Sequence, residues 1–225
     1  MKLYDLIHKK SHSHQPAATL SASGCECAND HPAGFSLVEL LIAMAVGLVV
    51  LGAMYSVFTI QNKTFANQEN FVEMQQSVRA GMDMMAREVG MAGYDPAGAN
   101  FAGVTVDANQ LEIRADLTGD GDAGDSNENI TYKYYDENSD YPYQIKRKTG
   151  AGSFQPFVEN VDSFTFQYLD GDDNVITDPA AAADVRQIKI TITGRTAKPD
   201  PAYTANDGYR TYTLTSIVAP RNLAY

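Results

Sequence analysis

The sequence predicts an α+β protein in which one long N-terminal helix packs on an antiparallel sheet. Two observations predict this class. No proline interrupts residues 35–93, and apolar residues there are either continuous or recur every third or fourth position. After residue 94, β-branched and aromatic residues alternate with polar ones, between stretches rich in turn-forming residues. Strands that follow a single helix are typical of an antiparallel sheet packed on that helix.

The first half of the predicted helix, residues 35–61, is apolar enough to enter a membrane. Leu40 to Phe58 gives 19 consecutive residues without a charge. At about 1.5 Å per residue, such a run crosses the hydrocarbon core of a bilayer. A fully buried core helix is the weaker interpretation, because soluble helices seldom run this long without a polar face. One carboxylate, Glu39, precedes this run, at a depth where an unpaired charge is costly.

The second half of the helix, residues 62–93, is predicted to be amphipathic. Charged residues, Glu88 among them, lie mainly off its apolar face, and Gly90, Gly93 and Pro96 are expected to end the helix. Packing against the folded domain is the expected role of this face, and a partner surface is the alternative. The face comprises Phe71, Met74, Val78, Met82, Met85 and Val89.

The remaining region, residues 94–225, is predicted to be a β-rich globular domain. A run of alanines at Ala180–Ala183 is too short to predict a helix. Segments with a period of two predict strands at residues 110–115, 130–135, 143–148, 163–168, 186–193 and 210–218. Turn-rich stretches separate them at residues 116–129, 149–153, 170–174 and 194–208.

The net charge of −11 belongs entirely to the part after residue 34, because the charges of residues 1–34 sum to zero. Nucleic acid is therefore not expected as a partner, since phosphate binding needs a basic surface. Lys9 and Lys10 precede the apolar run, and short basic segments favour the cytoplasmic side of a membrane. The N-terminus is thus expected inside the cell and the acidic domain outside the inner membrane.

All four histidines and both cysteines precede Gly34. The exported part therefore cannot be a disulfide scaffold, and it lacks the usual general base and thiol nucleophile of enzymes. The sequence favours a protein that is not an enzyme, and any metal bound after Gly34 would have oxygen ligands, as calcium or magnesium does. Cys25 and Cys27, among scattered histidines, are too sparse a pattern to predict a metal site.

The stretch GFSLVELLIA, Gly34 to Ala43, resembles the signal of type IV prepilins. In that family a prepilin peptidase cuts after the glycine and methylates the new N-terminal residue. The resemblance implies a leader of residues 1–34, cleavage between Gly34 and Phe35, and N-methylation of Phe35. Unlike a secretory signal peptide, this signal would leave the apolar segment on the mature protein. The family's glutamate corresponds to Glu39.

The same resemblance implies a role for Glu39 in assembly. After cleavage, the amine of Phe35 is a cation at the head of the helix, where it can pair with Glu39 of a neighbouring subunit. Such a pair would set the axial register between subunits more than it would add stability. The alternative is a glutamate that merely reaches the membrane interface.

Residues 75–98, residues 157–177 and the ending LTSIVAPRNL resemble PilW-type minor pilins and the related J-class minor pseudopilins of type II secretion. The resemblance implies a type IV pilin-like fold and a single-pass inner-membrane protein whose globular domain is periplasmic, and which then moves into a surface pilus. Implied partners are other minor pilins, the major pilin, the prepilin peptidase and the inner-membrane platform. A J-class pseudopilin is the alternative within this class.

Three features depart from the major pilins. The leader has no Lys or Arg close to Gly34, the helix has no proline before Pro96, and the domain has no cysteine. The last two argue against a bulk filament subunit. An alternative of another class is a membrane-anchored adhesin or ligand-binding domain, for which Tyr132, Tyr134 and Tyr135 supply aromatic side chains.

The acidic stretch DLTGDGDAGDSNE, residues 116–128, suggests a calcium loop between two predicted strands. Calcium loops place oxygen ligands at alternate positions and a glycine at the sharp turn, which is Gly121 here. Thr118 replaces the usual Asp or Asn, and Asn127 replaces the usual Glu at the twelfth position. The alternative is a solvated acidic hairpin loop. The candidate ligands are Asp116, Thr118, Asp120, Asp122, Asp125 and Glu128.

Overall fold

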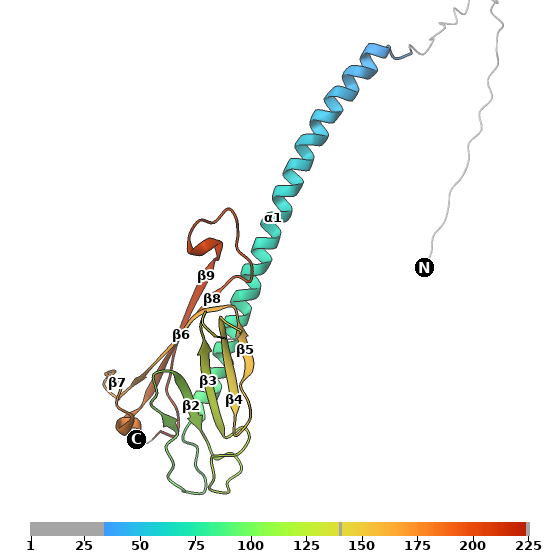
Figure 1. Ribbon diagram of the computed structural model, residues 1–225. Helices are drawn as coiled ribbons and strands as arrows, with labels where there is room; N and C mark the ends of the chain where they lie inside the picture. Colours follow the sequence, from blue (N-terminus) through green and yellow to red (C-terminus); the bar gives the residue numbers. More distant parts are fainter. Residues whose placement is uncertain (1–33, 140, 224–225) are drawn as a thin grey trace, which may run out of the picture. The chain divides into compact units, whose positions relative to one another are not determined.

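The computed structural model describes residues 34–139 and 141–223 (Figure 1). These residues divide into two compact units, with the division between Gly52 and Ala53. The proposed leader, apart from Gly34, lies outside the described residues, and so do the histidines and cysteines.

One α-helix, α1, runs without interruption from Leu37 to Gly90 (Figure 1). The expected bounds were residues 35 and 93, so the helix is shorter at both ends. Its C-terminus tightens into a turn in which the amide of Met91 bonds the carbonyl of Glu88 at 3.1 Å, three residues back instead of four. Gly93 then adopts a φ of +76°, which a helix cannot continue.

The strands form two antiparallel sheets. The first is a meander in the order β1-β2-β3-β4-β5, in which each strand pairs with the next in the sequence. Its strands are β1 (Val104–Thr105), β2 (Gln110–Arg114), β3 (Asn129–Tyr135), β4 (Gln144–Thr149) and β5 (Gln155–Glu159). The second has the order β7-β6-β8-β9 and contains β6 (Val161–Leu169), β7 (Val175–Ile176), β8 (Gln187–Arg195) and β9 (Thr211–Val218).

The α+β class and the six predicted strands are confirmed, but there are two sheets instead of one. Three strands were missed. Two of them, β1 and β7, have only two residues each, too few for a period of two to be visible. The third, β5, contains Pro156, which is tolerated because β5 is the edge strand of its sheet. The alanine run forms part of a short 3₁₀ helix, η1 (Pro179–Asp184), and a second, η2, covers Asn206–Gly208.

The hydrophobic core lies between the second half of α1 and both sheets. Every residue of the predicted apolar face from Met74 to Val89 is buried, while Phe71 is half-buried. On the sheet side, β8 buries alternate residues, Ile188, Ile190 and Ile192, as expected for a strand with one face on the core. Glu88 was predicted to lie off the apolar face, and this prediction is wrong, because the residue is buried with that face.

Two glycines let α1 approach both sheets closely. A Cβ atom added to Gly81 would collide with Cγ2 of Val158 on β5. A Cβ atom added to Gly194 on β8 would lie 2.5 Å from Cγ2 of Val78 on the helix. Each glycine therefore accommodates a buried valine of the facing element, and the spacing between helix and sheets depends on both.

We expect Gly81→Ala to destabilise the globular unit by about 1–3 kcal/mol, because the methyl group overpacks the contact with buried Val158. This cost exceeds the gain of up to about 1 kcal/mol from replacing glycine inside a helix. Thermal unfolding of the full chain in non-ionic detergent measures it. Gly90→Ala on the same helix is the matched control, since no atom lies within 4 Å of its added Cβ. Equal melting temperatures for the two variants would contradict this packing account.

Candidate functional site

The residues around the predicted cleavage point are accessible. Gly34, Phe35 and Ser36 precede α1, and Phe35 is 85% exposed. The amide of Leu40 donates to the carbonyl of Ser36 at 3.1 Å, so regular helical bonding begins just after the predicted cleavage point. A Cβ atom added to Gly34 would meet no atom within 4 Å. Within the described residues, nothing covers the bond between Gly34 and Phe35.

Glu39 lies in the first turn of α1, and its side chain is exposed. A carboxylate near a helix N-terminus is stabilised by the free amide groups of the first turn. Within residues 34–139 and 141–223, Glu39 takes part in none of the three ion pairs. The carboxylate is thus available to a cation outside the described chain.

The apolar half of α1 contributes nothing to the core. No residue between Gly34 and Glu73 is buried, and the exposed side chains include Leu40, Leu48 and Phe58. By length and composition, α1 is able to cross a membrane. A surface this apolar needs a cover of lipid or of other helices.

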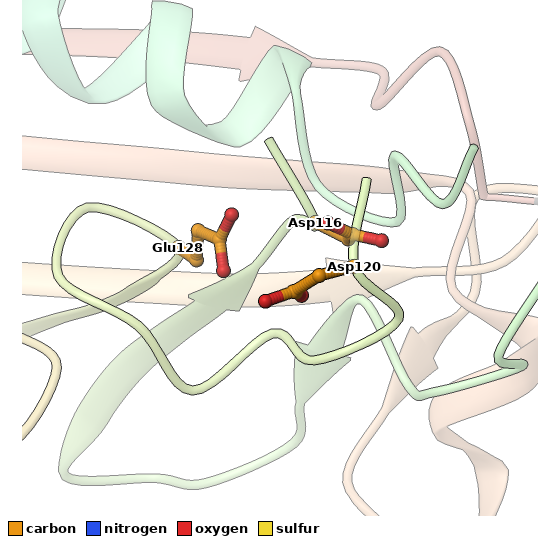
Figure 2. A group of neighbouring side chains, drawn as sticks. All are labelled: Asp116, Asp120 and Glu128. Atoms are coloured by element: carbon orange, nitrogen blue, oxygen red, sulfur yellow. The ribbon is translucent and has the colours of Figure 1, made fainter. Parts of the chain in front are cut away.

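The structure gathers three of the six candidate calcium ligands. The loop joining β2 to β3 brings one carboxylate oxygen each from Asp116, Asp120 and Glu128 within 4.8 Å of one another (Figure 2). Asp116 and Glu128 are buried, whereas Asp120 is exposed. The other two acidic candidates, Asp122 and Asp125, are exposed and lie outside this acidic cluster. Thr118 is also exposed, and its amide donates to Oε1 of Glu128.

Hydrogen bonds hold the acidic cluster in place. The amide of Ala115 donates to the carbonyl of Glu128 at 2.8 Å, which closes the base of the loop. The carboxylate of Asp116 accepts the amides of Gly119 at 2.6 Å and Gly121 at 3.0 Å, and Gly121 has the positive φ expected of the turn glycine. Oε1 of Glu128 accepts two further amides, from Leu117 and Thr118.

A buried charged contact between α1 and the first sheet was missed by the sequence analysis. Glu88 on α1 accepts a hydrogen bond from Nη2 of Arg147 on β4 at 2.7 Å and another from the hydroxyl of Tyr132 on β3. Burial, with the charge of Glu88, raises the pKa of Tyr132. Burial alone would lower the pKa of Arg147, but the hydrogen bond and charge of Glu88 raise it. At neutral pH, Arg147 is therefore a cation and Tyr132 a neutral hydrogen-bond donor to Glu88.

The tyrosines suggested for ligand binding are engaged within the fold. Tyr132 is fully buried, and the hydroxyl of Tyr134 donates to the carbonyl of Asp162 at 2.7 Å. The ammonium group of Lys146 lies 4.1 Å from the centre of the Tyr135 ring. Tyr132 is therefore inaccessible to a ligand, whereas Tyr134 and Tyr135 are half-buried.

Comparison with known proteins places a recognised sequence signal at the head of α1. Residues 30–55 match the family model described as the prokaryotic N-terminal methylation motif. Among solved structures, a type IV-like pilin from Thermus thermophilus is similar, with 15% sequence identity and a TM-score of 0.43. That match covers 67% of this chain and 98% of the other. No curated protein matches.

Proposed function

We propose that this chain, which carries the N-terminal methylation motif of type IV prepilins, is a PilW-like minor pilin that helps to initiate assembly of a type IV pilus. The observation that carries the proposal is the motif itself, followed without a break by an apolar helix whose side chains are exposed. The motif marks the cleavage and methylation signal. The exposed apolar half of α1 is the surface through which such subunits would pack against one another.

The two halves of α1 suggest the order of membrane insertion, cleavage and assembly. Residues 35–61 would hold the precursor in the inner membrane, with the N-terminus in the cytoplasm and the acidic domain in the periplasm. Cleavage after Gly34 would free the amine of Phe35 and leave the apolar helix in place. Helices of other minor pilins and of the major pilin would then replace lipid around it as the platform extrudes the filament.

Two features support a minor subunit over a bulk subunit. The helix has no proline up to Gly90, whereas major pilins carry one midway along the apolar half of their helix. The globular domain has no cysteine, so it cannot close the disulfide-bounded loop of many major pilins. A subunit present in few copies per filament is consistent with both differences from the major pilins.

We expect mature protein from sheared surface filaments to begin with N-methylated Phe35, at a small fraction of the abundance of the major subunit. Mass spectrometry of filament digests measures both the terminal peptide and the ratio. Mature protein that keeps residues 1–34 would overturn the proposal. A methylated protein confined to the membrane, in cells whose protein secretion fails without it, would instead assign the chain to a pseudopilus.

A substitution at Gly34 provides the matched control for processing. Gly34→Leu should leave full-length precursor on an immunoblot, because prepilin peptidases accept only a small residue before the cut. Gly34→Ala should still be cleaved. Gly34 is exposed, it precedes α1, and a Cβ atom added to it meets no atom within 4 Å, so a difference between the two variants reports cleavage and not folding.

A further inference from the structure

The acidic cluster in the β2–β3 loop has the composition and geometry of a metal site. We infer that Asp116, Asp120 and Glu128 bind a calcium ion, with water completing its coordination. This inference goes beyond the filament role and does not depend on it. Of the five carboxylates among the six candidate ligands, it selects the three that the fold brings together.

One buried oxygen of the acidic cluster lacks a partner. Glu128 is only 2% exposed, and its Oε2 atom has no hydrogen-bond donor within the described chain, although Oε1 has two. Buried carboxylate oxygens almost always have a hydrogen-bond partner, because an oxygen without one has lost its bound water and gained no other contact. A cation held between the three carboxylates would supply that missing partner.

The charge of the loop favours the same conclusion. Residues 116–128 contain five carboxylates and no Lys or Arg. The three ion pairs among residues 34–139 and 141–223 involve Glu88, Glu112 and Asp200, so none neutralises the loop. Backbone amides offset part of the charge on Asp116 and Glu128. Asp120 is turned toward Glu128 across the loop, where like charges repel unless a cation lies between them (Figure 2).

The coordination chemistry of the site suits calcium better than magnesium. Calcium binds oxygens at about 2.3–2.6 Å in flexible geometry, with water among its ligands. The three oxygens lie within 4.8 Å of one another, so one calcium ion can contact all three. Magnesium requires shorter distances, of about 2.0–2.1 Å, and near-ideal octahedral geometry, and it gives up its waters reluctantly. Exposed Asp120 leaves a side open through which calcium can enter with its waters.

The site would also connect two parts of the globular unit. The amide of Asp116 donates to the carbonyl of Tyr94, in the segment that follows α1, at 2.7 Å. The amide of Gly93 donates to the carbonyl of Arg114, at the end of β2, at 2.9 Å. Calcium bound at Asp116 would therefore stabilise both the β2–β3 loop and the chain leaving the helix.

Isothermal titration calorimetry of the full chain in non-ionic detergent, freed of metal with a chelator, tests the site. We expect one calcium per chain with a Kd of about 10⁻⁴ M, as in extracellular calcium modules, and much weaker binding of magnesium. Asp120→Asn and Glu128→Gln should each weaken calcium binding by about tenfold or more, because each removes a ligand charge. Asp120 is exposed, so its variant tests the site without threatening the fold.

Asp122→Asn is the matched control. Asp122 carries the same charge in the same loop, but it lies outside the acidic cluster, and an asparagine can still accept the amide of Gly124. Its calcium affinity should stay within about twofold of the unmodified chain. The proposal is overturned by an absence of calcium binding at millimolar concentration, by preference for magnesium, or by equal losses in Asp120→Asn and Asp122→Asn.

Discussion

Glu39→Ala is expected to leave cleavage and methylation intact while removing this subunit from surface filaments. The predicted cleavage point precedes α1, whereas Glu39 lies in its first turn, so the substitution leaves the residues on both sides of the cut unchanged. In the filament, the amine of Phe35 on a neighbouring subunit would lose its only proposed carboxylate partner. Breaking a buried ion pair by removing one member costs about 3–5 kcal/mol, which corresponds to a loss of incorporation of roughly a hundredfold or more.

The measurement is quantitative mass spectrometry of sheared filaments beside an immunoblot of whole cells. Glu39→Gln should behave like Glu39→Ala, because an amide keeps the polarity but not the charge. Glu69→Ala is the matched control, since Glu69 is an exposed glutamate on the same helix beyond the apolar segment. Normal incorporation of the Glu39→Ala protein would rule out the pairing with Phe35.

Arg147→Met is expected to destabilise the globular unit strongly. It leaves the carboxylate of Glu88, 9% exposed, with only the hydroxyl of Tyr132 as a partner among the groups that now bind it. Uncompensated buried charges of this kind cost about 3–5 kcal/mol. For a unit of this size, a loss of about 3 kcal/mol lowers the melting temperature by about 6–12 °C.

Arg114→Met is the matched control for that experiment. Arg114 pairs with Glu112 within β2 at 2.9 Å, but its side chain is 40% exposed, so water can replace the contact. Exposed pairs contribute about 0–1 kcal/mol. Thermal unfolding of both full-length variants in non-ionic detergent should separate them clearly. Similar melting temperatures would show that the contact of Glu88 with Arg147 stabilises the protein no more than the exposed pair does.

The double variant Glu88→Gln with Arg147→Met tests whether the cost of Arg147→Met comes from the unpaired charge that it leaves on Glu88. Removing both charges leaves no buried ion, so the double variant should be more stable than Arg147→Met alone. If the stability changes of Glu88→Gln and Arg147→Met add up to the change in the double variant, then Glu88 and Arg147 do not interact energetically.

Features that depend on residues close together in the chain could be predicted from the sequence. The long proline-free apolar run predicted α1, and the spacing of Met74, Val78, Met82 and Val89 predicted which face it buries. Six strands were visible in their alternating side chains. The methylation motif was recognisable because its signal is a short local pattern. Local periodicity suffices for such features, since a helix or strand has a fixed repeat.

Contacts between residues far apart in the chain could not be predicted and became visible in the three-dimensional fold. Glu88 read as a surface charge because nothing nearby in the sequence marks Arg147, 59 residues on, as its partner. In the acidic loop, sequence spacing proposed six ligands without showing which of them meet. Asp116 follows β2 and Glu128 precedes β3, so the pairing of these two strands brings the two residues together at the base of the loop. Asp122 and Asp125 lie between them in the sequence but outside the acidic cluster. Contacts between distant residues depend on how strands pair and pack, which no local repeat encodes.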